Sequence, residues 1–321
     1  QTPAFGWLKE RAQNFGFELS FPKNNWQGVS YEPWHWRYVR ATEAQAMFHP
    51  SPVGKTVVCA RALTKGIAAA VTALLTLSLI FQPPALHAME KVTFKTADGV
   101  QLVGQWYPHA PKKSSLILLH GLGSSKEEWQ DFAKYLSSKG YGALIYDQRG
   151  HGASTRTNSG GTINFQQFYG QGLDSEWGKM VYDLFDAVRF LKEKRGVKTA
   201  SIAVGGASIG ANIAARYAAV HTEVPFVILL SPGMNYQGLT TADVMPQLKS
   251  RPVALAASPG DRYAYQSVVS LEKMLSRPPS ETFIENPAAG HGVQMFRRAK
   301  SEQPSELEVK LLQWIQKQSL K

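Results

Sequence analysis

From about residue 89 onward, short apolar runs alternate with stretches of helical periodicity, and this alternation limits the possible folds more than any other feature. Apolar residues recur every three or four positions in the helical stretches, as between Trp177 and Leu191 and in a last helix at about 305–318. Strands that alternate with helices are typical of an α/β fold with a mostly parallel central sheet and helices on both faces. The runs, each compatible with a strand buried on both faces, are SLILLH, GALIYD, SIAVGG, FVILLS, PVALAAS and ETFIEN.

Two further runs, KVTFKT and QLVGQWY, come before these and are separated by the turn signal ADG. Two strands joined by so short a turn predict an antiparallel hairpin. We therefore expect the domain that spans residues 89–321 to open with a hairpin.

The sequence GGASIG contains the pattern G-x-S-x-G, with Ser208 at its centre and Gly206 and Gly210 two positions to either side. It lies between the run SIAVGG and the helical stretch IGANIAARYAAV, and a serine on a tight turn between a strand and a helix is typical of a catalytic nucleophile. Glycines at these positions let the neighbouring backbones approach closely. A glycine-rich turn without a catalytic role is the alternative.

A serine hydroxyl needs a base that takes its proton, and the base needs a carboxylate that fixes its tautomer. Asp261 follows the run PVALAAS, and His291 follows ETFIEN. Both are therefore expected on loops at the carboxyl ends of strands, where ligands meet parallel sheets. We expect Ser208, Asp261 and His291 to form a catalytic triad. A turn aspartate and a surface-loop histidine are the alternatives.

Acyl transfer also needs N–H donors for the negative charge that develops on the carbonyl oxygen. The N–H of Ile209 stands at the start of a predicted helix, where backbone donors point toward an anion. The N–H of Leu122, in the sequence LHGLGSS, follows a predicted strand. We expect these two groups to form the oxyanion hole.

Residues 89–321 resemble the α/β-hydrolase superfamily in these motifs and in YDQRGHG at 146–152. The resemblance implies the α/β-hydrolase fold and an esterase-like serine hydrolase; dienelactone hydrolases, acyl esterases and serine aminopeptidases share these marks. It further implies a small-molecule ester or thioester as the substrate, no cofactor and no metal in the hydrolase domain. About ten residues separate FVILLS from the next predicted helix, so no large cap is expected.

The glycine-rich segment 153–175 carries three aromatic side chains, Phe165, Phe168 and Tyr169. These rings either line a pocket for the acyl group or pack the segment against the sheet, and the sequence leaves both readings open.

The first 46 residues form a separate segment rich in tryptophan. From Phe5 the sequence FGWLKERAQNFGFELSFPKNNWQGVSYEPWHWRYV resembles the C-terminal end of the VanY-type zinc D-alanyl-D-alanine carboxypeptidases, which trim bacterial peptidoglycan. The resemblance maps a catalytic base onto Glu32 and a zinc ligand onto His35. A catalytic zinc needs three protein ligands, and the family takes the other two from a segment upstream of this one. We therefore expect residues 1–46 to be a truncated fragment without zinc. A zinc D-alanyl-D-alanine carboxypeptidase is the alternative if the missing half is present.

Residues 67–81, IAAAVTALLTLSLIF, form an apolar run without charge that follows basic residues and precedes small residues up to Ala88. This is the layout of a signal peptide, and a membrane span usually needs about 20 apolar residues. We expect residues 47–88 to be a signal peptide or a membrane anchor. The protein would then be periplasmic, extracellular or anchored in the cytoplasmic membrane through residues 67–81. A buried core helix is the alternative.

The formal net charge is +11, yet no stripe of Lys and Arg interleaved with aromatic residues accompanies it, so no nucleic-acid partner is expected. The single cysteine, Cys59, excludes a disulfide within the chain and a cysteine-rich metal site. A third reading, from outside the enzymes, is a wall-binding or scaffold protein in which the tryptophan-rich segment provides adhesion.

Overall fold

The computed structural model of the chain describes residues 88–248, 251–275, 282–298 and 303–318, together with two short strands near the N-terminus. The chain divides into two compact units, Gln1–Leu74 and Leu75–Lys321. In the first unit, β1 (Phe17–Leu19) pairs antiparallel with β2 (Trp36–Tyr38). The predictions for Glu32, His35, Cys59 and the apolar run 67–81 lie outside the described residues. Within the described part of the chain, no helix is both long and apolar enough to cross a membrane.

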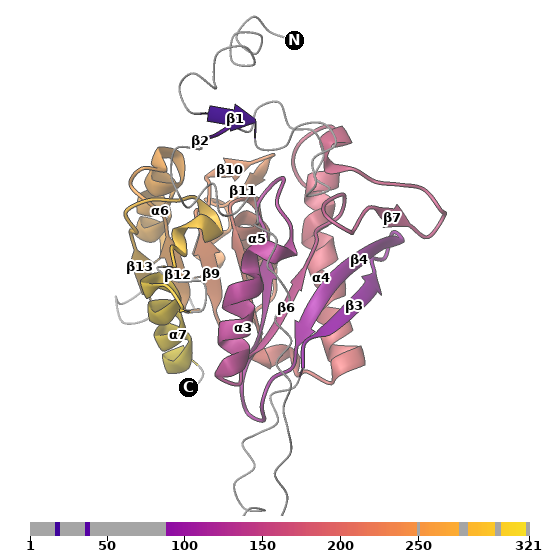
Figure 1. The fold of residues 1–321 in the computed structure, drawn as a ribbon, viewed down its shortest axis with the longest axis horizontal. Coiled ribbons are helices and arrows are strands. Elements are labelled where there is room, and N and C mark those ends of the chain that lie inside the picture. Colours follow the sequence, from indigo (N-terminus) through magenta and orange to yellow (C-terminus); the bar gives the residue numbers. More distant parts are fainter. Residues whose placement is uncertain are drawn as a thin grey trace, which may run out of the picture. The chain divides into compact units, whose positions relative to one another are not determined.

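The second unit is built on one sheet in the order β13-β12-β9-β8-β5-β6-β4-β3, with β7 paired to β4 (Figure 1). All neighbouring pairs from β6 through β13 are parallel, whereas β4 runs antiparallel to β3, β6 and β7. This confirms the mostly parallel sheet, the opening hairpin and the predicted runs. The strands are β3 (Glu90–Lys95), β4 (Val100–Tyr107), β5 (Ser115–Leu119), β6 (Gly142–Tyr146), β7 (Arg156–Thr157), β8 (Ile202–Ala207), β9 (Val227–Leu230), β12 (Val253–Ala256) and β13 (Thr282–Glu285).

Helices cover both faces of the sheet, as predicted (Figure 1). One apolar core includes Leu184, Ala214 and Val268, and the other includes Phe132 and Leu311. Three of the described helices therefore pack on one face and two on the other. The first group is α4 (Glu176–Arg195), α5 (Ile209–Val220) and α6 (Arg262–Met274); the second is α3 (Gln130–Ser138) and α7 (Glu306–Gln318).

The ends of α4 follow from local chemistry. The Ser175 hydroxyl accepts a hydrogen bond from the N–H of Gly178, and Gly196 ends the helix with a φ of 66°, a conformation that suits glycine. The predicted apolar stripe of α4 is buried except at Phe185, which is 36 % exposed. Its ring packs edge-on against Tyr217 of α5 with centroids 4.9 Å apart.

The segment between β9 and β12 is short, as the absence of a large cap requires. It holds a hairpin of β10 (Asn235–Tyr236) and β11 (Leu239–Thr240), followed by a 3₁₀ helix at Met245–Leu248. Asp243 lies in the turn before this 3₁₀ helix, where its carboxylate accepts from the Thr240 hydroxyl at 2.7 Å.

Candidate active site

Ser208 occupies the sharp turn between β8 and α5, with φ 55° and ψ −125°. A non-glycine residue with positive φ is strained by on the order of 1 to 3 kcal/mol and persists only where the surroundings hold it. A Cβ on Gly206 would lie 2.3 Å from the carbonyl carbon of Gly210, and one on Gly210 would lie 2.5 Å from the carbonyl oxygen of Leu119. Both glycines are therefore required for this turn, which leaves the serine partly exposed.

The structure brings Asp261 and His291 together. Asp261 immediately precedes α6, and His291 follows β13. The Nδ1 atom of His291 lies 2.5 Å from Oδ2 of Asp261. Because a carboxylate only accepts hydrogen bonds, this contact places the proton of a neutral imidazole on Nδ1 and leaves a lone pair on Nε2.

The loop that carries His291 packs against the turn that carries Ser208. The N–H of Gly292 donates to the Ser231 hydroxyl at 2.8 Å, and the N–H of Ser208 donates to the carbonyl of Leu230 at 2.9 Å. A Cβ on Gly292 would lie 3.9 Å from the backbone nitrogen of Ser208. The two segments are thus neighbours, although no hydrogen bond among the described residues joins Ser208 directly to His291.

The loop after β5 lies over the serine. A Cβ on Gly121 would come within 3.4 Å of the Cβ of Ser208. The N–H of Gly121 donates to Oε1 of Glu128 at 3.0 Å, and the Ser124 hydroxyl donates to Oε2 at 2.5 Å. The backbone N–H of Gly121 is therefore already used in a hydrogen bond. The next N–H along the loop is that of Leu122, the predicted oxyanion donor. Ile209 is the first residue of α5, where helix N–H groups have no partner within the helix.

Glu128 is a residue that the sequence analysis missed. Burial raises the pKa of its carboxyl, while the hydrogen bonds from Ser124 and Gly121 and the charge of His291 act in the opposite direction. This carboxylate fixes the loop that carries Leu122 and faces the candidate base. The seven-residue spacing between Gly121 and Glu128 belongs to no recognised motif, so no signal in the sequence pointed to this contact.

Tyr236 is the second residue that the sequence analysis missed. Its hydroxyl lies 3.4 Å from the carbonyl oxygen of Ser231, and its ring packs edge-on against Tyr263 with centroids 5.5 Å apart. Burial raises the pKa of this phenol well above its ordinary value, the charge of Asp261 adds to the shift, and the neighbouring Ser208 side chain acts in the opposite direction. The β10–β11 hairpin thus brings a phenol to the serine.

Two buried histidines, His120 and His151, lie next to the loop after β5. The Nε2 atom of His120 accepts from the N–H of Gln148 at 2.9 Å, so its Nδ1–H donates to the carbonyl of Gly121 at 2.8 Å. Burial lowers the pKa of His120 to about 4 and that of His151 to about 3. Both imidazoles are therefore neutral near neutral pH.

The aromatic side chains of segment 153–175 pack against the domain rather than standing free, with one exception. The ring of Phe165 stacks on His151 with centroids 4.1 Å apart, and that of Phe168 packs edge-on against Trp177 at 4.9 Å. Tyr169 is 86 % exposed. Phe165 and Phe168 thus make the contacts that the packing reading expects.

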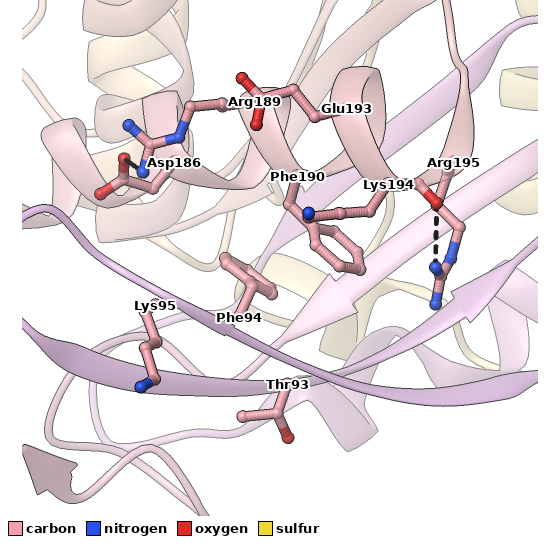
Figure 2. A pocket seen from close by; sticks show the side chains of 9 residues that line it. All are labelled: Thr93, Phe94, Lys95, Asp186, Arg189, Phe190, Glu193, Lys194 and Arg195. Atoms are coloured by element: carbon pink, nitrogen blue, oxygen red, sulfur yellow. Dashed lines mark hydrogen bonds and ion pairs between the residues drawn. The ribbon is translucent and has the colours of Figure 1, made fainter. Parts of the chain in front are cut away.

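No group of three or more His, Cys, Asp and Glu side chains within the described ranges could hold a metal ion. A cavity of about 520 Å³ lies between β3 and α4, where Figure 2 shows Phe94 and Phe190 side by side among charged side chains. Its lining includes none of the candidate catalytic residues, so we do not assign the substrate to it.

The sheet order and the serine on a strand-to-helix turn define the α/β-hydrolase class of enzymes. Residues 110–281, more than half of the chain, match the family model described as serine aminopeptidase, S33. The chain belongs to this family of α/β hydrolases. Residues 1–41 match the model of the VanY D-alanyl-D-alanine carboxypeptidases, which confirms the resemblance of the N-terminal segment.

Curated relatives of the chain are fungal. It is 31% identical over 153 residues to the polyketide transferase ATR5 of Stachybotrys chlorohalonatus, which covers 47% of each protein. It is 28% identical over 173 residues to the thiohydrolase aneE of Aspergillus aculeatus, covering 52% of this chain and 50% of that protein. The chain thus spans about half the length of these relatives. They do not support the bacterial source that the VanY resemblance implies.

Solved structures share the fold. An esterase of Pyrococcus furiosus, Pf2001, superposes with a TM-score of 0.58 at 20% identity, covering 74% of this chain and 94% of that one. The α/β hydrolase GrgF of a Penicillium species superposes with a TM-score of 0.55 at 16% identity, covering 73% of this chain and 100% of that one. The family match makes the chain an α/β hydrolase, and these superpositions show that it shares the fold.

Proposed function

We propose that the chain hydrolyses carboxylic esters or thioesters through an acyl-enzyme on Ser208. His291 takes the proton of the serine hydroxyl on Nε2 while Oγ attacks the carbonyl carbon of the substrate. The same imidazole then gives this proton to the departing alcohol or thiol. Water attacks the acyl-enzyme in a second round, with His291 again as the base, and releases the acid.

Asp261 holds the imidazole in the tautomer that this cycle needs and stabilises the imidazolium that forms. The N–H groups of Leu122 and Ile209 bind the oxygen that becomes negative. No cofactor enters any step. The observation that carries the proposal is the 2.5 Å contact between His291 Nδ1 and Asp261 Oδ2 on a loop packed against the strained Ser208 turn.

The test is steady-state hydrolysis of aryl esters with acyl chains of graded length by the wild type and by Ser208→Ala. We expect a measurable kcat/KM for at least one chain length, and a loss of on the order of 1000-fold or more in the variant. Equal rates for the two proteins would refute the role of Ser208.

Acyl transfer to an alcohol is a second candidate, favoured by relatives named as a polyketide transferase and an acyltransferase. An acyl-enzyme can react with an alcohol in place of water, so the chemistry on Ser208 is shared. Adding small alcohols to the assay separates the two. A new ester at the expense of the free acid supports transfer, and unchanged release of acid supports hydrolysis.

For the N-terminal segment, we propose that residues 67–81 direct export and that residues 1–46 bind no zinc. N-terminal sequencing of the protein recovered from cell fractions tests export; a mature chain that begins near residue 89 outside the cytoplasm is the expected result. Metal analysis tests the second point, because stoichiometric zinc that His35→Ala removes would favour the carboxypeptidase alternative.

A further inference from the structure

The hydroxyl of Tyr236 lies where the serine segment and the histidine loop meet. It donates a long hydrogen bond to the carbonyl oxygen of Ser231 at 3.4 Å. The hydroxyl of the same Ser231 accepts from the N–H of Gly292, the residue that follows the candidate base, at 2.8 Å. The carbonyl of the preceding residue, Leu230, accepts from the N–H of Ser208 at 2.9 Å. The two residues Leu230 and Ser231 therefore contact the phenol, the nucleophile segment and the base segment.

The hairpin that carries the phenol and the oxyanion loop follow strands on opposite sides of β8. In the sheet, β8 lies between β5 and β9. The loop that carries Leu122 follows β5, whereas the hairpin that carries Tyr236 follows β9. The base gives its proton to the leaving group, so the side of the serine that faces the His291 loop is the side from which the alcohol or thiol departs.

The hairpin holds the phenol in a fixed position. Its two-residue turn has positive φ at both Gln237 and Gly238, 53° and 78°, as a tight hairpin with the twist of its strands requires. The Tyr263 hydroxyl of α6 both donates to the carbonyl and accepts from the N–H of Asn235 at 2.9 Å. The ring of Tyr236 rests on that of Tyr263.

The backbone around the hairpin is fitted to this ring. A Cβ on Gly233 would lie 2.6 Å from Cε2 of Tyr236, so the close approach of the ring requires glycine. The buried amide of Asn212 in α5 donates to the carbonyls of Gly233 and Leu239, at 2.9 and 2.6 Å, and fixes both sides of the hairpin to the core.

The phenol keeps its proton. Burial raises its pKa, and the negative charge of Asp261 raises it further. Near neutral pH the group is therefore a hydrogen-bond donor and not a source of a transferred proton. Its position beside the serine then decides which atom of a substrate it meets.

We propose that the Tyr236 hydroxyl donates a hydrogen bond to the oxygen of the departing alcohol and so makes the chain selective for oxygen esters over thioesters. The inference rests on the proposed acyl-enzyme function and names its substrate class. Sulfur is a weak acceptor, so a thioester gains little from the same donor.

The chemical step balances without a further reactant. The Ser208 Oγ forms a bond to the carbonyl carbon, and its proton moves to Nε2 of His291. When the tetrahedral intermediate collapses, the bond between the carbonyl carbon and the alcohol oxygen breaks, and that oxygen takes the proton from Nε2. Tyr236 turns its O–H from the carbonyl of Ser231 to this oxygen as its charge develops, and it retains its own proton throughout.

The experiment compares kcat/KM for ethyl butyrate and S-ethyl thiobutyrate in the wild type and in Tyr236→Phe. These substrates share the acyl group, and kcat/KM reports acylation, the step in which the leaving group departs. Removal of one hydrogen bond to a developing charge is expected to lower kcat/KM for the oxygen ester roughly tenfold to hundredfold, and for the thioester less than about threefold. Tyr182→Phe, on the exposed face of α4, is the control that loses a phenol elsewhere and is expected to change neither value.

A selective loss for the oxygen ester supports the proposal. An equal loss for both substrates indicates a structural role and overturns it, as does no loss for either. If Tyr236→Phe does not fold, Tyr263→Phe, which releases the hairpin from α6, is expected to shift the ratio in the same direction, and an unshifted ratio there overturns the proposal. Fluorophosphonate labelling at Ser208 separates failure of the acyl-enzyme function from failure of the role of Tyr236. If the wild type is not labelled, the acyl-enzyme function fails. If it is labelled but Tyr236→Phe leaves the ratio of kcat/KM for ester and thioester unchanged, only the role of Tyr236 is refuted.

Discussion

The carboxylate of Glu128 accepts a hydrogen bond from the N–H of Gly121 at 3.0 Å, and this contact fixes the backbone immediately before Leu122. The same carboxylate takes the Ser124 hydroxyl on its other oxygen. An oxyanion hole works because its donors are in place before the reaction, so the group that holds the loop matters as much as the donors. Glu128 is therefore a positioning residue in this account.

Replacement of Glu128 tests that role. Glu128→Ala is expected to lower kcat on the order of 100-fold, the cost of one lost oxyanion donor, with a smaller change in KM. Glu128→Gln retains one acceptor for the Gly121 N–H and is expected to recover part of the loss. Steady-state kinetics on an aryl ester measure both. A loss confined to KM would contradict the positioning role.

The two glycines that flank Ser208 give a steric prediction. Gly210→Ala would place a methyl group 2.5 Å from the backbone oxygen of Leu119, which cannot move without displacing β5. We expect this variant either to accumulate in insoluble form or to fold with fluorophosphonate labelling reduced at least tenfold. Gly161→Ala, whose nearest neighbour is the flexible side chain of Thr157 at 3.1 Å, is the control and should behave as the wild type. Wild-type labelling in Gly210→Ala would show that the turn has room for a methyl group at this position.

A buried arginine joins three parts of the domain. The guanidinium of Arg149, 1 % exposed, pairs with Asp98 of the β3–β4 turn and with Glu176 and Asp183 of α4. Arg149→Met leaves the buried Asp183 without its partner, and breaking a buried pair typically costs about 3 to 5 kcal/mol. Urea unfolding should show a loss of that size.

The matched control for Arg149 is Lys134→Met, because Lys134 pairs with Asp131 at 3.7 Å and both side chains are 57% exposed. Such exposed pairs contribute about 1 kcal/mol or less. Equal losses of unfolding free energy in the two variants would argue against a structural role for the Arg149 cluster.

The buried histidines predict how stability depends on pH. The pKa of His151 is about 3 in the folded protein, against an ordinary value near 6.5, so the unfolded chain binds one more proton between these values. Its contribution to stability is therefore complete above about pH 6.5 and falls as the pH drops. His151→Phe keeps an aromatic ring against Phe165 and removes the group that takes up the proton. Between pH 6 and 4, the free energy of unfolding should fall with decreasing pH in both proteins. The slope in the variant should be smaller than that of the wild type by about 1.4 kcal/mol per pH unit.

Urea titrations at several pH values measure these slopes. Burial also raises the pKa of Glu128 and Asp183, which acts in the opposite direction in this window. Both proteins share those groups, so the difference between the slopes isolates His151. Identical slopes would mean that this imidazole is not buried in its neutral form.

Most of the fold was predictable because the apolar runs and the helical stripes are long and local. The same regularity predicted the strand ends that carry Ser208, Asp261 and His291, and the structure places Asp261 and His291 in contact. Their catalytic roles remain predictions.

Glu128 and Tyr236 were not predictable in the same way. Tyr236 stands on a strand of two residues, too short for any periodicity, and only the Gln-Gly turn signal in NYQGLT indicates the hairpin. The role of Glu128 depends on how the loop after β5 folds back on the 3₁₀ helix at Lys126–Trp129, a contact that residue spacing does not encode. The predicted apolar stripe of α4 was wrong in including Phe185 among the buried residues, because the ring packs against a neighbouring helix rather than against the sheet.

Mass mapping of the fluorophosphonate adduct tests the central claim most directly. The account predicts one phosphonylated peptide, modified at Ser208, with labelling abolished in Ser208→Ala and slowed at least 100-fold in His291→Ala. An adduct on a different serine, or labelling that persists unchanged in Ser208→Ala, would contradict it.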